Sequence, residues 1–477
     1  MKLNKREKPT SNDKEVIALL TGASSFLLAV YLLSSFRSYV NADAGYYLGV
    51  TELIHQGFVP YRDFRLGYTP LLFYALQIPR LFMGTYPNYW GYILFLYLIV
   101  IVDAFLLAMI VRRITKSNKL AWLSGLVFLV FYYYLEGAYL ILESFSLCFG
   151  LVSLLLLLGE RGSFWRMFLA GVFSAFSFLT KQYGVLFAGV IGLMMLFSHD
   201  NWKKRLRNCI SAMFGFCGVI AVFFLLFFIS GLKPDKLIEA LSGGGYGGQS
   251  IKMYVEGVVR SVRLFPFLLF VPCLFFNKEE NELSLIIGCI AGLLMASIQF
   301  YFNVFSHYYI FMIPFVLVLA VLLWKRLNQK KLSRMWSLLC YGFMFVSVAI
   351  PMQEIYNSSK TLIKHNLREP QIQTANQIRQ IVDTYDCKSA LCYWNTIQYY
   401  GLCPLQPSRM KEYGFSFGYD TEETYVERLK DADCFIVRNE DIQSLSQQDA
   451  FYHCLTEDFS LVKDEKLKST SVFVRNK

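Results

Sequence analysis

This sequence has few charged residues and lacks the residue spacings that are typical of metal sites. Only 17% of the 477 residues are charged, whereas soluble proteins carry about 25%. No Cys-x-x-Cys pair and no cysteine–histidine spacing of the zinc-binding kind is present. The glycine run at 242–248 lacks the Lys-Ser/Thr ending of a P-loop. These absences exclude a soluble enzyme, a zinc domain bound through cysteine and a nucleotide-binding loop.

Long hydrophobic runs are what the sequence has instead. Apolar residues make up 55% of the chain, and the mean hydropathy is +0.40. A helix needs roughly 20 apolar residues to cross a bilayer. About eleven runs approach that length, which predicts a polytopic α-helical membrane protein: 16–36, 89–111, 119–134, 138–158, 166–180, 182–198, 208–231, 258–276, 282–301, 308–326 and 333–352.

The positive charge predicts the orientation. The formal net charge is +11, and an excess of Lys and Arg marks the cytoplasmic loops of membrane proteins. With that number of spans, the basic segments at 1–15, 112–119, 203–207 and 325–334 all fall on one side. The N-terminal segment 1–15 is therefore expected in the cytoplasm. The loops account for the basic charge, so no nucleic-acid partner is needed.

Two large regions are expected on the opposite side of a transmembrane domain at 16–352. The first is the loop 37–88, in which 70–84 is interpreted as an interfacial segment, because a crossing there would move every later basic cluster outside. The second is 353–477, whose alternating polar and apolar residues predict a small α/β domain. Its expected helices lie at 371–385 and 421–431, and its expected strands at 389–394, 433–438, 459–464 and 470–475.

Asp43 is the first candidate for chemistry. It follows the first apolar run and stands close to the start of a short amphipathic helix expected at 44–56. One interpretation is that it only caps that helix. The other is a general base at the membrane surface, because partial desolvation raises the basicity of a carboxylate.

The stretch 60–74 (PYRDFRLGYTPLLFY) concentrates further candidates just before the interfacial segment. Arg62 and Arg65 have the forked geometry that binds phosphate oxygens, and Tyr61 and Asp63 are candidate substrate-binding residues beside them. The alternative is a pair of surface ion pairs, formed by either arginine with Asp63 or Glu52. Both interpretations stay open on the sequence.

Lys181 and Gln182 follow the apolar run 166–180 at its outer end. A lysine there either extends to the interface without function or binds a phosphate. Glu143 lies about one turn inside another run, with Glu136 in the loop before it. A carboxylate at membrane depth is a functional candidate, and a solvated helix end is the alternative.

His307 and Asn303 share an outer turn, in the sequence FNVFSHYY. Together with the neighbouring tyrosines they make a candidate edge that faces a sugar or a phosphate. The alternative is an aromatic belt at the interface, where Tyr is common.

These motifs together resemble a known family. Asp43 follows the first helix, and the outer loop carries GFVPYRDF at 57–64. With TKQ at 180–182 and SHYY at 306–309, the pattern resembles the bacterial GT-C membrane glycosyltransferases, among them protein mannosyltransferases, aminoarabinose transferases and Rgt-type lipopolysaccharide glycosyltransferases. The resemblance covers 16–352, and the tail resembles the α/β appendage of many bacterial members.

The resemblance implies an integral glycosyltransferase of the bacterial inner membrane. It would move a sugar, with inversion, from a polyprenyl-phosphate-linked donor to a glycan, lipid or protein acceptor of the cell envelope on the extracytoplasmic face. Asp43 would be the general base. Arg62, Arg65 or Lys181 would neutralise the departing phosphate, and Asp63 or His307 would orient the sugar or the acceptor.

One departure and one open point limit that implication. Many protein mannosyltransferases carry Asp-Glu where this chain has Asp43 and Ala44, which argues against protein O-mannosylation. Related GT-C oligosaccharyltransferases use a divalent metal, but no ligand cluster in this sequence supports one. Two rival functions stay open, a flippase for a lipid-linked sugar and a polysaccharide polymerase or ligase.

Overall fold

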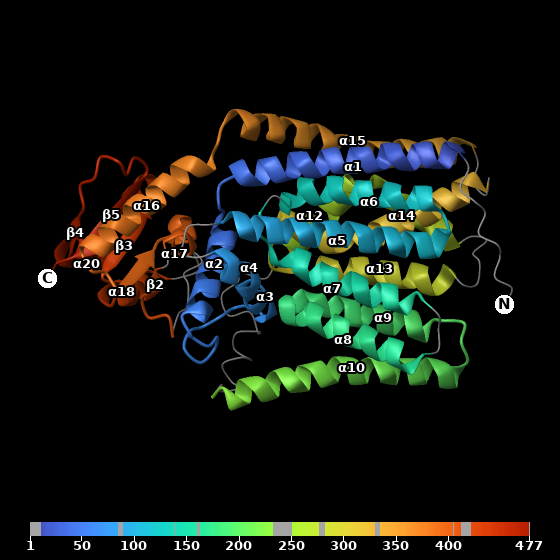
Figure 1. Cartoon of the computed structure of the whole chain (residues 1–477), viewed down its shortest axis with the longest axis horizontal. Helices are drawn as coiled ribbons and strands as arrows, with labels where there is room; N and C mark the ends of the chain where they lie inside the picture. The colour runs from blue at the N-terminus through green and yellow to red at the C-terminus, as the bar shows by residue number, and fades with distance from the viewer. Residues whose placement is uncertain are drawn as a thin grey trace.

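The computed structural model describes residues 11–83, 89–137, 139–159, 163–231, 250–275, 282–329, 334–403, 405–411 and 421–476. The glycine run at 242–248 lies outside the described residues. Figure 1 shows a bundle of helices along the long axis of the molecule, with a small sheet domain at one end and the N-terminus at the other.

Apolar runs form the helices of the bundle, and each expected run has a helical counterpart. The long-axis helices are α1 (Ser11–Arg37), α5 (Trp90–Thr115), α6 (Asn118–Tyr132), α7 (Leu142–Leu157), α8 (Phe164–Thr180), α9 (Leu186–Leu196), α10 (Trp202–Ile229), α13 (Leu283–Ser297), α14 (Ile313–Asn328) and α15 (Arg334–Lys364). The run 258–276 becomes α12 (Ile251–Leu264) and the 3₁₀ helix η3 (Pro266–Phe275), which meet at a bend of 85°.

The prediction of a polytopic α-helical membrane fold is confirmed, but the count of about eleven spans is not. Within the described residues, seven helices are long and apolar enough to cross a membrane, and the bent pair would make eight. The apolar helices α7, α8 and α9 are shorter. At 1.5 Å per residue, the 16 residues of α7 extend about 24 Å, less than the about 30 Å of a hydrocarbon core.

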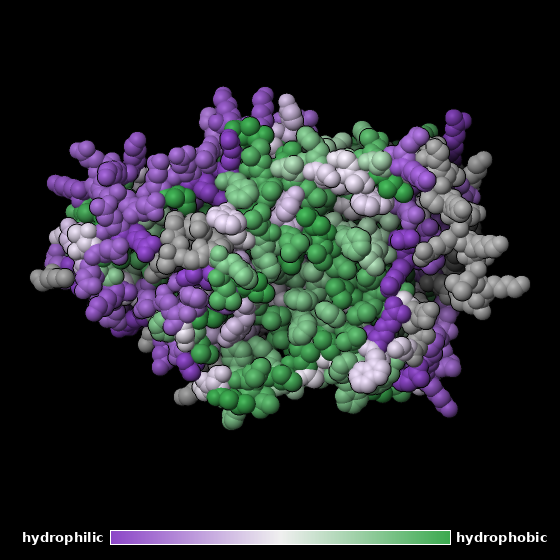
Figure 2. All heavy atoms as spheres, viewed as in Figure 1, coloured by the Kyte–Doolittle hydropathy of each residue, from purple (hydrophilic) through white to green (hydrophobic). Residues whose placement is uncertain are grey.

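The surface of the bundle matches a lipid environment. Figure 2 shows an apolar band across the middle of the visible face, between polar regions at the sheet-domain end and at the N-terminal end. Large apolar side chains on the outer helices are widely exposed, among them Phe26 on α1, Phe228 on α10 and Phe345 on α15. Such a continuous apolar surface is unfavourable in water and favourable in a bilayer.

The first loop forms a layer of short helices between the bundle and the sheet domain (Figure 1). These are α2 (Ala42–His55), α3 (Leu71–Ala75) and α4 (Gln77–Met83). The segment expected to be interfacial is thus two short helices rather than one span. Arg80 on α4 forms an ion pair with Glu52 on α2 at 2.9 Å, which joins these two helices of the layer.

The tail folds into the expected small α/β domain. Its mixed sheet has the order β2-β1-β3-β5-β4, with strands β1 (Ser389–Cys392), β2 (Gln406–Pro407), β3 (Cys434–Arg438), β4 (Phe459–Leu461) and β5 (Thr470–Arg475). β1 runs parallel to β2 and β3, whereas β5 is antiparallel to β3 and β4. Its helices are α16 (Arg368–Thr384), α17 (Gln398–Leu402), α18 (Glu422–Lys430), α19 (Asn439–Leu445) and α20 (Asp449–Asp458). The sequence predicted all of these strands except β2.

Candidate active site

Five ionisable side chains from five separate segments converge where the layer of short helices meets the bundle. Electrostatic coupling joins the Asp43 carboxylate to each of the other four. The set, which we call the acidic cluster, is Asp43, Glu136, Glu143, Lys181 and His307. The sequence had singled out four of these residues separately, and the structure brings them together.

Asp43 stands in the first turn of α2, but it does not cap the helix. The cap is Asn41, whose side-chain oxygen accepts a hydrogen bond from Ala44 N at 2.9 Å. The interpretation of Asp43 as the cap is therefore wrong, because the helix begins one residue before it. Among the described residues, none donates a hydrogen bond to the Asp43 carboxylate or forms an ion pair with it, which leaves the carboxylate available to a ligand.

Glu136 enters the cluster through a break in the helix. The segment η1 (Tyr133–Gly137) continues α6, but Glu136 has φ +67° and Leu135 leaves helical geometry as well. A left-handed backbone at a residue with a side chain is uncommon and costs about 1–2 kcal/mol. The kink turns the Glu136 carboxylate to His307, whose Nδ1 lies 2.8 Å from Oε2. In the sequence, Glu136 is recognisable only as a second carboxylate near Glu143.

Glu143 and Lys181 form a buried ion pair. Their side chains are 1% and 4% exposed, so neither is the solvated or interfacial residue that the alternative interpretations describe. The lysine follows the last residue of α8, and its Nζ also lies 4.7 Å from the ring centroid of Tyr308 and 5.8 Å from that of Tyr183. Two aromatic rings and one carboxylate thus hold the ammonium group in place.

His307 links the two glutamates. It lies in the 3₁₀ helix η6 (Ser306–Met312), and its Nε2 is 3.7 Å from Oε1 of Glu143 while Nδ1 contacts Glu136. The ring stacks on Phe305, at 5.5 Å between centroids. The two glutamates and Phe305 therefore hold the imidazole ring in one orientation.

The surroundings of Asp43 change its acidity. Burial raises the pKa of the Asp43 carboxyl, and the carboxylates of Glu143 and Glu136 raise the pKa further, while His307 and Lys181 lower it; burial is the largest of these influences. A carboxylate with a raised pKa is a better proton acceptor than an exposed one. Asp43 is thus a candidate base within electrostatic reach of Lys181 and His307, whose side chains are held by Glu143 and Glu136.

Arg62 and Asp63 pair with each other instead of joining the cluster. Arg62 donates from Nε and Nη2 to the two carboxylate oxygens of Asp63, at 2.9 and 2.7 Å, and from Nη1 to the Ser230 carbonyl at 3.2 Å. The guanidinium of Arg62 lowers the pKa of Asp63. This is the surface ion pair that the sequence left open. Tyr61 supports the same turn, since its hydroxyl donates to the Tyr68 carbonyl.

Other predicted residues lie around the cluster. Burial raises the pKa of the Tyr46 hydroxyl, which hydrogen-bonds to the Gly67 backbone. The charge of Asp43 raises that pKa further, and the charge of Arg65 lowers it. Gln182 donates to the Gly67 carbonyl at 2.9 Å, so it joins the first loop to the segment after α8. Asn303 hydrogen-bonds to the amide of its neighbour Val304.

No group of three His, Cys, Asp or Glu side chains within the described ranges is arranged to hold a metal ion.

Solved structures share this architecture. ArnT from Cupriavidus metallidurans bound to undecaprenyl phosphate aligns with a TM-score of 0.65 at 15% identity, covering 96% of this chain and 98% of that one. Archaeal oligosaccharyltransferase AglB from Archaeoglobus fulgidus, in complex with an inhibitory peptide and a dolichol-phosphate, aligns with a TM-score of 0.57 at 9% identity, covering 98% and 74%. No protein-family model and no curated protein sequence matches the chain. The similarity confirms the predicted GT-C membrane glycosyltransferase fold, including the sheet domain.

Proposed function

We propose that this protein is an inverting membrane glycosyltransferase that uses a polyprenyl-phosphate-linked sugar as donor. The acceptor is a glycan or lipid of the cell envelope, and transfer takes place on the extracytoplasmic face of the bacterial inner membrane, where α2 and the tail lie. The observation that carries the proposal is the acidic cluster, in which the Asp43 carboxylate has a raised pKa, has no ion-pair partner among the described residues and lies within electrostatic reach of Lys181 and His307. The GT-C fold, found in proteins solved with undecaprenyl phosphate or dolichol-phosphate, supports it.

The proposed reaction needs one base and stabilisation of one leaving group. Asp43 accepts the proton of the acceptor hydroxyl while that oxygen attacks the anomeric carbon. The bond from the anomeric carbon to the phosphate oxygen breaks, and the lipid phosphate leaves with the electron pair. A single displacement inverts the anomeric configuration. Lys181 and His307 stabilise the negative charge that develops on the phosphate.

The surrounding residues have separate roles in this proposal. Arg65, whose charge reaches the Tyr46 hydroxyl as that of Asp43 does, contacts the donor phosphate, and Arg62 stays paired with Asp63. The prenyl chain lies along the apolar surface of α3 and α4, where Leu81 and Phe82 are 71% and 85% exposed.

The test is transfer from a panel of radiolabelled polyprenyl-phosphate sugars by the purified protein in lipid nanodiscs. Asp43→Asn removes the base and keeps the shape, so we expect kcat to fall by about 10²–10⁴-fold. The matched control is Asp386→Asn in the sheet domain. Asp386 is exposed and has φ +50°, a conformation that asparagine tolerates, so this variant should keep wild-type activity.

Other outcomes would contradict the proposal. Equal turnover by wild type and Asp43→Asn would remove Asp43 from the mechanism. Donor movement across a vesicle membrane without any transfer would indicate a flippase. Repeated addition of units to a growing chain would indicate a polymerase.

A further inference from the structure

The backbone that leads into α2 is held by the sheet domain. Residues 38–41 connect α1 to α2 and end at Asn41, which caps the helix two residues before Asp43. More than 320 residues later in the chain, α16 begins beside this connection (Figure 1). The start of α2, and with it the position of Asp43, therefore depends on contacts that α16 makes.

Gln371 on α16 makes the most direct of these contacts. Its Oε1 accepts from Val40 N at 2.7 Å, and its Nε2 donates to the Val40 carbonyl at 2.9 Å. The side-chain amide thus satisfies both polar backbone groups of one residue, in the way that a neighbouring β-strand would. Val40 itself is 1% exposed, so an unpaired amide there would be unfavourable.

Arg368, one turn earlier on α16, fixes the end of α1. Its Nη2 donates to the Ser35 carbonyl at 2.7 Å and its Nε to the Ser38 carbonyl at 3.2 Å. Its guanidinium also lies 4.6 Å from the ring centroid of Tyr89, just before α5. The sheet domain therefore binds the last turn of α1 and the connection to α2 as one unit.

A second element of the sheet domain packs directly on α2. At the crossing of α2 and α17, a Cβ on Gly45 would lie 2.1 Å from the Cα of Gln398, and a Cβ on Gly401 would lie 2.3 Å from the Gly45 carbonyl oxygen. Only glycine at both positions permits this approach. Gly45 is two residues after Asp43.

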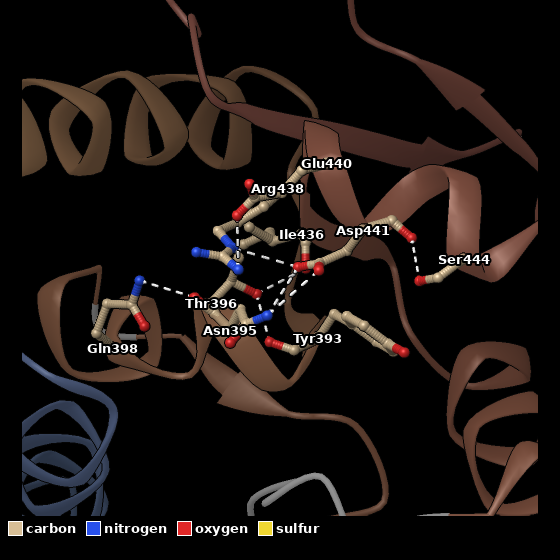
Figure 3. Close-up of polar contacts among 9 residues, drawn as sticks. All are labelled: Tyr393, Asn395, Thr396, Gln398, Ile436, Arg438, Glu440, Asp441 and Ser444. Atoms are coloured by element: carbon tan, nitrogen blue, oxygen red, sulfur yellow. Dashed lines mark hydrogen bonds and ion pairs between the residues drawn. The ribbon is translucent and has the colours of Figure 1, made fainter.

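The sheet holds α17 in turn. Figure 3 shows Gln398 hydrogen-bonded to the Asn395 carbonyl, and the Asn395 side chain directed at the carboxylate of Asp441, beside Arg438. Asn395 donates to both oxygens of Asp441 at 3.3 and 3.1 Å, and Arg438 Nε lies 3.3 Å from one of them. The 3₁₀ helix η7 (Trp394–Thr396), which follows β1 and precedes α17, is thus joined to α19, which follows β3.

From these contacts we propose that the sheet domain positions the base for catalysis, with Gln371 as the positioning residue that sets the start of α2. The inference rests on the proposed function, since it assigns Gln371 a role in placing Asp43. Gln371 acts through Val40 and Asn41 and touches neither donor nor acceptor. A misplacement of about 1 Å at a reacting group lowers turnover by about 100-fold. Loss of the two hydrogen bonds between Gln371 and Val40 should therefore reduce kcat.

The experiment compares Gln371→Ala with Gln373→Ala in the full-length protein in nanodiscs. Gln373 is an exposed glutamine on the same helix, so it controls for the loss of a glutamine from α16. For Gln371→Ala we expect kcat to fall about tenfold to 100-fold, with the KM for the donor within twofold of wild type. The acidic limb of the kcat–pH profile should move to lower pH, because a displaced Asp43 is better solvated while Glu136, Glu143, Lys181 and His307 stay in place. Gln371→Glu keeps the acceptor for Val40 N–H but replaces the donor to the Val40 carbonyl with a carboxylate oxygen, so it should recover only part of the lost kcat.

Amide hydrogen exchange of the peptide spanning 38–45 gives a second measurement that needs no turnover. Exchange should become faster in Gln371→Ala and stay unchanged in Gln373→Ala. Unchanged exchange, or a kcat and pH profile equal to the control, would overturn the positioning role. If the wild type transfers no sugar at all, the proposed function fails, and the exchange measurement still decides whether Gln371 holds the start of α2.

Discussion

The buried ion pair between Glu143 and Lys181 allows a sharp test of how the acidic cluster is held together. The perturbations are Lys181→Met, Glu143→Gln and the two combined. Each single change leaves one charge buried without its main partner, whereas the combined change leaves no charge at this pair. A double-mutant cycle on the free energy of unfolding therefore separates the pairing from the burial.

The expected magnitude follows from what surrounds the pair. Removing one member of a buried pair destabilises a protein by about 3–5 kcal/mol. After Lys181→Met, His307 Nε2 still lies 3.7 Å from the Glu143 carboxylate. After Glu143→Gln, the ring of Tyr308, 4.7 Å from Nζ, still attracts the ammonium. Each single variant should thus lose about 3 kcal/mol of unfolding free energy, at the lower end of that range. The double variant should lose only about 1–2 kcal/mol, since replacing a whole buried pair is often nearly neutral.

The assay is denaturant unfolding in bicelles, followed by tryptophan fluorescence, for the wild type and the three variants. Additive losses, agreeing within about 0.5 kcal/mol, would mean that the two charges do not interact. Single variants as stable as the wild type would mean that the pair is hydrated. Either result would refute the arrangement of the cluster described above.

Three further predictions concern the layer of short helices. The kcat for transfer should fall as the pH drops through the raised pKa of Asp43, above the ordinary carboxyl range near about 4, because the base acts only when deprotonated; a flat kcat–pH profile from pH 4 to 8 would contradict this. Gly45→Ala should separate α2 from α17, lowering the free energy of unfolding by about 1–3 kcal/mol and reducing kcat, whereas Gly342→Ala, where a Cβ meets nothing within 4 Å, should do neither. Arg62→Ala breaks a pair that is 42% exposed on the arginine side and should leave the midpoint of denaturant unfolding unchanged.

The sequence predicted the parts of the fold that depend on local patterns. Apolar runs of bilayer length gave the helices, and the alternation in the tail gave β1, β3, β4 and β5 within one or two residues at most ends. It missed β2, which is only two residues long and has no pattern of its own. The sequence analysis counted α7, α8 and α9 as membrane spans like the others, whereas these helices are shorter than the length needed to cross a bilayer.

The candidate site was predicted as separate residues but not as a cluster. Asp43, Glu143, Lys181 and His307 were singled out because charged groups are costly near a bilayer, and that cost is a property of each residue. Which of them meet depends on chain crossings between segments up to 264 residues apart, from Asp43 to His307. Glu136 joins them only through a left-handed backbone that no sequence pattern predicts, and Gln371 contacts the backbone of Val40, not a recognisable side-chain partner.

The ion pair between Glu143 and Lys181 contributes more to the position of the lysine than to the stability of the protein. A buried pair adds little stability over an apolar replacement of similar volume, yet it fixes the Lys181 ammonium in one position before any substrate arrives. Stabilisation of developing charge is largest when the stabilising group needs no reorganisation at the moment of reaction. The double variant Glu143→Gln, Lys181→Met is therefore expected to lose only about 1–2 kcal/mol of stability and to transfer almost no sugar. Substantial transfer by that variant would show that the departing phosphate does not depend on the cation of the cluster.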